Sequence, residues 1–364
     1  MKSNKYIFAA AFLAILFNQP LKAQQVDKKW IRPLNSKSEA MWGINNGIVF
    51  SIWPTAVENG KDVIGGPRGL IRVGYENKGT IYLINFLAIE PVVKGKTEYS
   101  EISPSLIDNQ WGKLMWAGGS DKETAYFAGA KTRGTILHPD SRNQEIEELS
   151  VYIFMERFKS GAHPYLRLFI RSDQPEELGI EVFNHDGSTT MERCVVTATM
   201  GNYSRLRKLH LKDQIVNSLA LYKGYNDIDF IEKESYGAEQ LWKAGNGDLI
   251  AIAESDEDFN SLKSWPKEKS YLDRSGWLYR PNLKLSQYWR KKGSEFDSSL
   301  ELRVNGRAKY WSGGSRELQN YINIPGGPSF ENFELRENYK PGQKFYFGIT
   351  RKAPEQFLKD FNKN

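Results

Sequence analysis

Short runs of β-branched, aromatic and aliphatic residues recur along most of the chain, and each run is bounded by Gly, Pro, Asn or Asp. Runs of this kind between turn-forming residues are typical of β-strands. The longest apolar run, residues 80–93 (TIYLINFLAIEPVV), predicts a strand that is buried on both faces. In all, the pattern predicts strands over residues 47–53, 70–75, 80–93, 150–158, 165–171, 178–183, 192–199, 249–254, 286–290, 299–304, 329–335 and 344–350.

Helical periodicity is confined to two short segments. Pro354 opens one that runs to Phe361, and residues 213–222 form a shorter candidate. Strands that follow one another without intervening helices indicate antiparallel sheets packed face to face. We therefore predict an all-β protein, a large antiparallel β-sandwich of the supersandwich or jelly-roll type with few short helices. Because no Ser- or Pro-rich linker divides the chain, residues 24–364 are expected to form one domain.

The first 23 residues have the pattern of a signal peptide. Lys2 and Lys5 precede an apolar run over residues 6–17, and Ala23 offers a small residue at the cleavage position. A run of this length is too short to span a bilayer, which favours a cleaved signal over an uncleaved anchor. No later run is long enough to cross a membrane. We expect a periplasmic or secreted protein without a membrane span.

The charge of the chain argues against one class of partner. The full sequence has a formal net charge of +6, and removal of the three lysines in residues 1–23 leaves +3. A nucleic-acid-binding protein usually concentrates far more basic charge than this. Nucleic acid is therefore excluded as the expected partner, and a preference for acidic ligands would have to come from local clusters of basic residues.

Several kinds of site have no sequence signature. Cys194 is the single cysteine, so no intramolecular disulfide can form. The four histidines lie at least 22 residues apart, which fits no zinc motif. Residues 256–260 resemble the start of a calcium loop, but Ser261 replaces the glycine and Lys267 stands where the bidentate Glu belongs. We expect no metal site and no cofactor; a structural calcium ion held by carbonyl oxygens elsewhere stays open.

The C-terminal hairpin carries a family resemblance. Residues 332–335 and 339–349 form two strand-like segments with a turn at Pro341 and Gly342. This ending resembles those of large sandwiches in carbohydrate-active proteins, especially the galactose-mutarotase-like supersandwich. The chain as a whole is similar to secreted glycan-utilisation proteins of environmental and gut bacteria. The resemblance implies a large β-sandwich and a carbohydrate partner, and it carries no catalytic motif.

The densest polar cluster lies in residues 199–213. If this segment is extended, Tyr203, Arg205 and Arg207 share one face, close to His210. Cleavage of a uronic-acid glycan by β-elimination needs a base, an acid and a group that neutralises the carboxylate. Tyr203 and His210 suit the proton transfers, and Arg205 and Arg207 suit the carboxylate. The alternative is a solvated, basic edge strand.

Hydrolysis would need a pair of carboxylic acids instead. Glu90 ends the long apolar strand, where burial can raise the pKa of a carboxyl group as a general acid requires. Glu98 or Glu101 could supply the second acid, and Glu331 and Glu334 are similar candidates. Alternatively, Glu90 ends its strand only in order to reach solvent.

Aromatic residues make up 13% of the chain, with 10 Trp and 18 Tyr. Many stand beside Gly, Pro or basic residues, where an exposed ring could stack on the flat C–H face of a sugar. A large sandwich also buries many tryptophans, so a core role is open for each of them. The candidate substrate-binding residues are Arg207, Trp53, Arg68, Trp289, Arg290 and Trp311.

These patterns together favour an exported protein that acts on carbohydrate, an acidic glycan above all. Cleavage by β-elimination is slightly favoured over hydrolysis. A non-catalytic glycan-binding protein is the alternative from another class, and an interaction or structural protein of the cell envelope is a third. An enzyme should gather basic and titratable residues at one place with aromatic walls, whereas a binding module should present aromatic rings on an open face.

The signal-peptide interpretation predicts a processed N-terminus. Because Ala23 follows the apolar run at a suitable distance, the exported protein should begin at Gln24 or within a few residues of it. N-terminal sequencing of protein recovered outside the cytoplasm tests this. Exported protein that still began at Met1 would contradict it.

Overall fold

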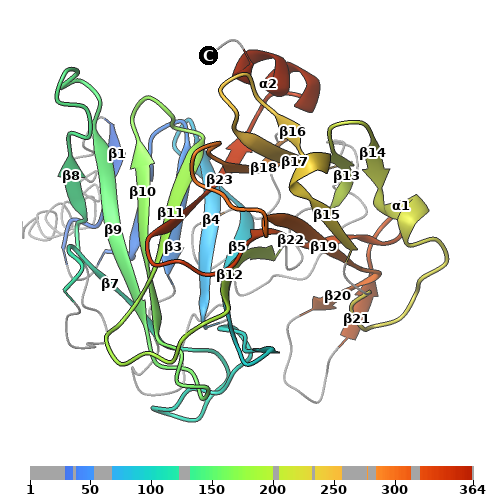
Figure 1. Cartoon of the computed structure of the whole chain (residues 1–364), viewed down its shortest axis with the longest axis horizontal. Coiled ribbons are helices and arrows are strands. Elements are labelled where there is room, and N and C mark those ends of the chain that lie inside the picture. The colour runs from blue at the N-terminus through green and yellow to red at the C-terminus, as the bar shows by residue number, and fades with distance from the viewer. Residues whose placement is uncertain are drawn as a thin grey trace, which may run out of the picture.

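The computed structural model describes residues 29–35, 38–52, 68–122, 132–199, 205–231, 234–255, 277, 284–312 and 320–362. These residues contain 23 strands and two α-helices, and every strand pair is antiparallel (Figure 1). The prediction of an all-β protein built from antiparallel sheets is confirmed. No helix in the described ranges is long and apolar enough to cross a membrane. The predicted signal peptide, residues 1–23, lies outside them.

One layer of the fold, here called the first sheet, combines strands from both ends of the chain. Its neighbours in space are, in order, β1 (Trp30–Ile31), β2 (Met41–Ile44), β3 (Ile48–Ile52), β4 (Leu70–Asn77), β5 (Thr80–Val93), β12 (Arg193–Thr199), β22 (Ser329–Arg336), β19 (Glu301–Arg307) and β15 (Glu234–Gly237).

The opposite layer, the second sheet, is built in the same way. Here β7 (Met115–Gly118) and β8 (Thr135–Leu137) both pair with β9 (Glu148–Met155), followed in space by β10 (Pro164–Arg171), β11 (Glu177–Asn184), β23 (Gln343–Thr350), β18 (Ser286–Lys291), β17 (Leu249–Ser255), β13 (Leu206–His210) and β14 (Ile215–Asn217).

The two sheets are joined through β13 and β22. Leu206 of β13 also pairs with Phe330 of β22, so 21 strands form one connected network. Three small additions complete it: β6 (Lys96–Thr97) pairs with β5, β16 (Trp242–Lys243) pairs with β17, and β20 (Lys309–Ser312) and β21 (Asn320–Asn323) form a separate hairpin.

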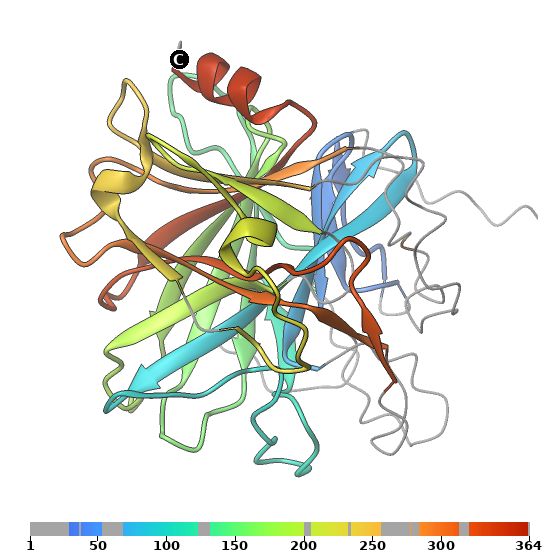
Figure 2. The same cartoon turned by 90° about the vertical axis from the view of Figure 1, so that its right-hand side faces the viewer.

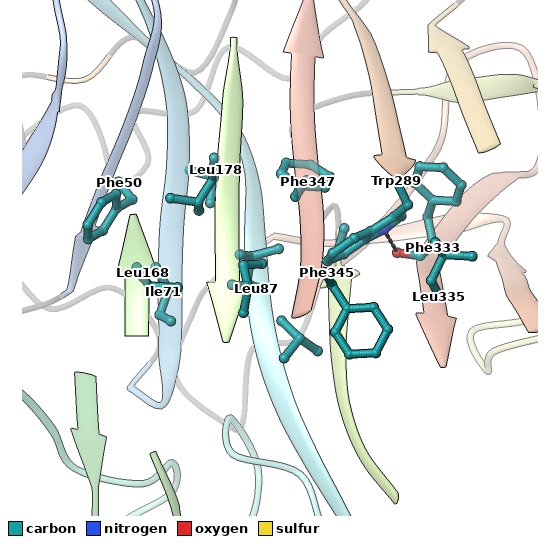
Figure 3. Packing of buried hydrophobic residues seen from close by; sticks show 14 of the residues in the cluster. Phe50, Ile71, Leu87, Leu168, Leu178, Trp289, Phe333, Leu335, Phe345 and Phe347 are labelled. Carbon is teal, nitrogen blue, oxygen red and sulfur yellow. Dashed lines mark hydrogen bonds between the residues drawn. The ribbon is translucent and has the colours of Figure 1, made fainter. Parts of the chain in front are cut away.

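A single large apolar core fills the space between the sheets. Alternate residues of each strand point inward, as the period of two requires. Figure 3 shows Phe50, Ile71 and Leu87 of the first sheet packed with Leu168 and Leu178 of the second. All five side chains are fully buried. This contiguous core accounts for a stable fold without a disulfide.

Among the described residues, side-chain hydrogen bonds cross the core between the sheets. Trp289 Nε1 of β18 donates to the Phe333 carbonyl of β22 at 2.7 Å (Figure 3). Asn85 Nδ2 of β5 donates to Gln287 Oε1 of β18 at 2.5 Å, and both side chains are buried. A buried polar group without a partner destabilises the folded state. Each of these bonds therefore helps to fix the position of one sheet relative to the other.

Both helices are short. The predicted helix over residues 354–361 is confirmed as α2 (Pro354–Phe361), and its Phe357 packs on Tyr288 of the second sheet. The prediction of a helix over residues 213–222 is wrong for its first half, which forms β14. Only α1 (Ser218–Leu221) is helical there, and the Asn217 side chain caps it by accepting from the Leu219 N–H.

The crossing bond of Trp289 generates a stability prediction. Replacement of Trp289 by Ala should lower the free energy of unfolding by about 3–5 kcal/mol, because it leaves a cavity and removes a partner of the Phe333 carbonyl. The matched control is Ile215→Ala at a side chain that is 56% exposed, which should change stability by less than about 0.5 kcal/mol. Urea denaturation measures both. Equal midpoints for the two variants would contradict the core role of Trp289.

Candidate functional site

The two arginines of the predicted 203–210 cluster hold a turn of the protein itself. Arg205 Nη1 donates to the Pro325 carbonyl at 3.0 Å. Arg207 donates to the carbonyls of Pro325 at 2.8 Å and Gly327 at 2.6 Å, and also to that of Pro328. Both side chains are buried, at 5% and 1% exposure. The prediction of two exposed arginines that grip a carboxylate is therefore wrong: their donors are directed at main-chain carbonyls.

His210 belongs to a different environment. Its Nε2 lies 3.9 Å from Glu254 Oε1, and Lys208 and Lys284 also contact that carboxylate at 3.1 and 3.3 Å. Burial lowers the pKa of His210, partly opposed by Glu254. Tyr203, the remaining member of the predicted cluster, lies outside the described residues.

Glu90 sits in an ion-pair network on the outer face of the first sheet. Its Oε2 lies 3.5 Å from Arg303 Nη2, and the same nitrogen contacts Glu334. Both carboxylates are almost fully buried, at 1% and 0% exposure. On the neighbouring strands β12, β19 and β22, Glu301 forms a separate set of ion pairs with Arg193 and Arg336. The interpretation that Glu90 ends its strand to reach solvent is wrong, and its charge is balanced by neighbours.

Three other predicted substrate-binding residues are buried or bonded to other residues of the protein. Trp289 is fully buried in the core, so it presents no ring to a sugar. Arg290 is 3% exposed and pairs with Glu177 and Asp248. Arg68 donates two bonds to Asp108, at 2.9 and 3.1 Å. Trp53 lies outside the described residues, as does the side chain of Trp311.

An accessible group of histidines and tyrosines lies instead on the outer face of the second sheet. We call it the His–Tyr cluster. The rings of His163 and His185 are 4.0 Å apart, and Tyr165 lies 4.7 Å from His185. All three are half-buried. Further rings surround them on the same face, those of Tyr152, Phe154 and Phe183.

Strand register explains how this cluster forms. Tyr165 of β10 is paired with Phe154 of β9 on one side and with Phe183 of β11 on the other, so the three side chains share a face. The planes of Tyr165 and Phe183 differ by only 17°. At the ends of the same strands, the His185 N–H donates to the His163 carbonyl and brings the two imidazoles together. Figure 1 shows β9, β10 and β11 side by side.

The pKa values of two titratable groups in the cluster are shifted in opposite directions. Burial lowers the pKa of His185, and the positive charge of Arg157 lowers it further, against the opposing effect of Asp186. Burial raises the pKa of Tyr165, assisted by the charge of Asp121. At neutral pH the imidazole of His185 is therefore uncharged and the phenol of Tyr165 keeps its proton.

Arg157 and His163 are held at the edge of the cluster by the main chain. Arg157 is exposed, and its Nη1 donates to the carbonyls of Gly161 at 3.3 Å and Gly187 at 2.9 Å. His163 Nε2 lies 3.0 Å from the Met155 carbonyl, which can only accept, so this nitrogen carries the proton. The cluster thus offers a proton acceptor, a proton donor and a cation on one aromatic surface.

Sequence reasoning missed this cluster because its members come from three strands. The signal was present in the hairpin formed by residues 165–171 and 178–183, both of which were predicted as strands. Pairing them in register places His163 opposite His185, although 22 residues separate them in the chain.

Comparisons with known proteins add no family. No protein-family model matches the chain, and no curated protein matches it significantly. In the part of the chain that the structure describes, no group of three or more His, Cys, Asp or Glu side chains is placed to hold a metal ion.

The charge of Arg157 generates a titration prediction. The pKa of His185 should lie below its ordinary value of about 6.5, and Arg157→Gln should move it upward because a repelling charge is lost. Since the folded state then disfavours protonation, His185 should favour folding most above about pH 6.5 and less as the pH falls. NMR titration of the imidazole measures the shift. Arg142→Gln, at an exposed arginine that pairs with Asp140, is the control; a pKa of His185 above 6.5 would contradict the analysis.

Proposed function

We propose that the protein binds an acidic glycan at the His–Tyr cluster and cleaves it by β-elimination. The observation that carries the proposal is the half-buried pair of His185 and Tyr165, whose rings lie 4.7 Å apart on an aromatic face. Their opposite pKa shifts favour an uncharged imidazole next to a phenol that can donate a proton. The guanidinium of Arg157 adds positive charge at the edge of the same site.

Each group has a role in the reaction. The imidazole of His185 takes the proton at C5 of a uronate, and the electron pair of the C–H bond forms the C4–C5 double bond. The C4–O bond breaks, and the phenol of Tyr165 gives its proton to the leaving oxygen. Arg157 stabilises the negative charge that builds up on the carboxylate. His163, whose ring lies 4.0 Å from that of His185 at a tilt of 33°, keeps the base in position.

The aromatic rings around the pair support a carbohydrate substrate. Tyr152 and Phe183 are half-buried and present flat faces on which the C–H face of a sugar ring can stack. A uronate combines such a face with a carboxylate, which matches rings beside an arginine. Hydrolysis has less support, because two of its candidate acids, Glu90 and Glu334, are buried against Arg303.

Non-catalytic glycan binding is the second candidate function. It is favoured by the same stacked rings, which need no proton transfer in order to hold a sugar. Either function is proposed for a protein exported to the periplasm or the medium, since residues 1–23 have the pattern of a signal peptide.

Activity of site variants on uronic-acid polymers tests the proposal. The wild-type protein should release unsaturated products from polygalacturonate or alginate, measured by absorbance at 235 nm. His185→Ala and Tyr165→Phe should each lower kcat by about 10²–10⁴-fold, since each removes a proton-transfer group. Arg157→Gln should lower kcat/KM by about 10²–10³-fold.

The control is His138→Ala, at an exposed histidine outside the cluster, which should keep full activity. Full activity of both His185→Ala and Tyr165→Phe would overturn the catalytic assignment. Binding of the polymers without any unsaturated product would favour the second candidate.

A further inference from the structure

One loop displays four large apolar side chains to solvent. In the segment 98–113, here called the Trp111 loop, Trp111 and Leu106 are each 58% exposed, Ile107 is 57% exposed and Ile102 is 47% exposed. Isolated exposed apolar residues are common, but a group of them in one loop marks an interaction surface.

Hydrogen bonds from Arg68 and within the loop hold its backbone. Arg68 donates to both carboxylate oxygens of Asp108 and, at 3.0 Å, to Gln110. The Ser105 hydroxyl accepts from the N–H groups of Ile107 and Asp108. These bonds hold the backbone that carries the apolar side chains, which lowers the entropy lost on binding.

The same loop is bonded to the segment that carries Arg157. Glu156 accepts from the Leu106 N–H at 2.7 Å, and Lys113 Nζ donates to the Arg157 carbonyl at 3.2 Å. Glu98 accepts from the N–H groups of Lys159 and Ser160. Figure 2 shows the loop in teal at the lower end of the sandwich, with α2 in red at the opposite end.

We propose that the Trp111 loop is a second contact surface for the glycan, one that holds sugar residues away from the bond being cleaved. The occupant follows from the continuity of the loop with the proposed site and from the indole of Trp111, on which a sugar face can stack. Leu106, Ile107 and Ile102 widen the apolar surface. The inference rests on the proposed function and adds to it that the substrate is a polymer long enough to reach both surfaces.

Polymer binding and chain-length dependence test the inference separately from catalysis. Trp111→Ala should be retarded less than wild type in native gels that contain polygalacturonate or alginate, with neutral dextran as the comparison probe. The KM for the polymer should rise on the order of tenfold, as expected when one well-ordered contact is lost. Cleavage of a short oligosaccharide of the same polymer should stay unchanged. Trp111→Phe, which keeps a ring, should recover most of the loss.

The control and the remaining outcomes decide the assignment. Ile215→Ser, at a side chain that is 56% exposed on β14, should behave as wild type. Unchanged polymer retardation and KM in Trp111→Ala and in Leu106→Ser would overturn the inference. A membrane-binding result would also overturn it. In that case the wild-type protein would co-sediment with phosphatidylglycerol vesicles, Trp111→Ala would not, and the two proteins would bind the polymer equally. If Trp111→Ala lost polymer binding while His185→Ala stayed fully active, the catalytic role of the His–Tyr cluster would be rejected and the binding role of the Trp111 loop would stand.

Discussion

The apolar filling between the two sheets is the constraint on which the rest of the structure depends. Every strand that lines this space gives one of its two faces to it, so most charged side chains of these strands lie on the outer faces. Tyr165, for example, is half-buried while Leu166 and Leu168 of the same strand are fully buried. The core thereby fixes the backbone beneath the His–Tyr cluster, and the position of each ring follows from the register of β9, β10 and β11.

The local sequence pattern was sufficient to predict the all-β architecture, because the residues that favour strands and turns are neighbours in the sequence. The run over residues 80–93 became β5, and the two segments on either side of the turn at Pro341 and Gly342 became β22 and β23. The prediction that these two form a hairpin is wrong, because β22 pairs within the first sheet and β23 within the second. What could not be predicted is which strands pair at long range. The first sheet joins β5 to β12 and β12 to β22, so residues more than 100 positions apart meet on one face.

The candidate site shows the same limit at the level of side chains. Arg205 and Arg207 were predicted as ligand-binding residues because the sequence does not reveal that they donate hydrogen bonds to carbonyls of residues 325–328. Glu90 looked like an isolated acid, although Arg303 lies beside it in the fold. The cluster of His163 and His185 was hidden for the opposite reason, since two unremarkable histidines become neighbours only when a hairpin closes.

The place of β23 in the second sheet has a consequence for how the chain acquires its structure. This strand, Gln343–Thr350, lies between β11 and β18, so neither neighbour has a complete set of main-chain partners until it is inserted. A growing or truncated chain without it would expose two unpaired strand edges, which invite association with other chains. The sandwich must therefore close late, after almost the whole chain is available, and a helper that shields strand edges would be most useful before that moment.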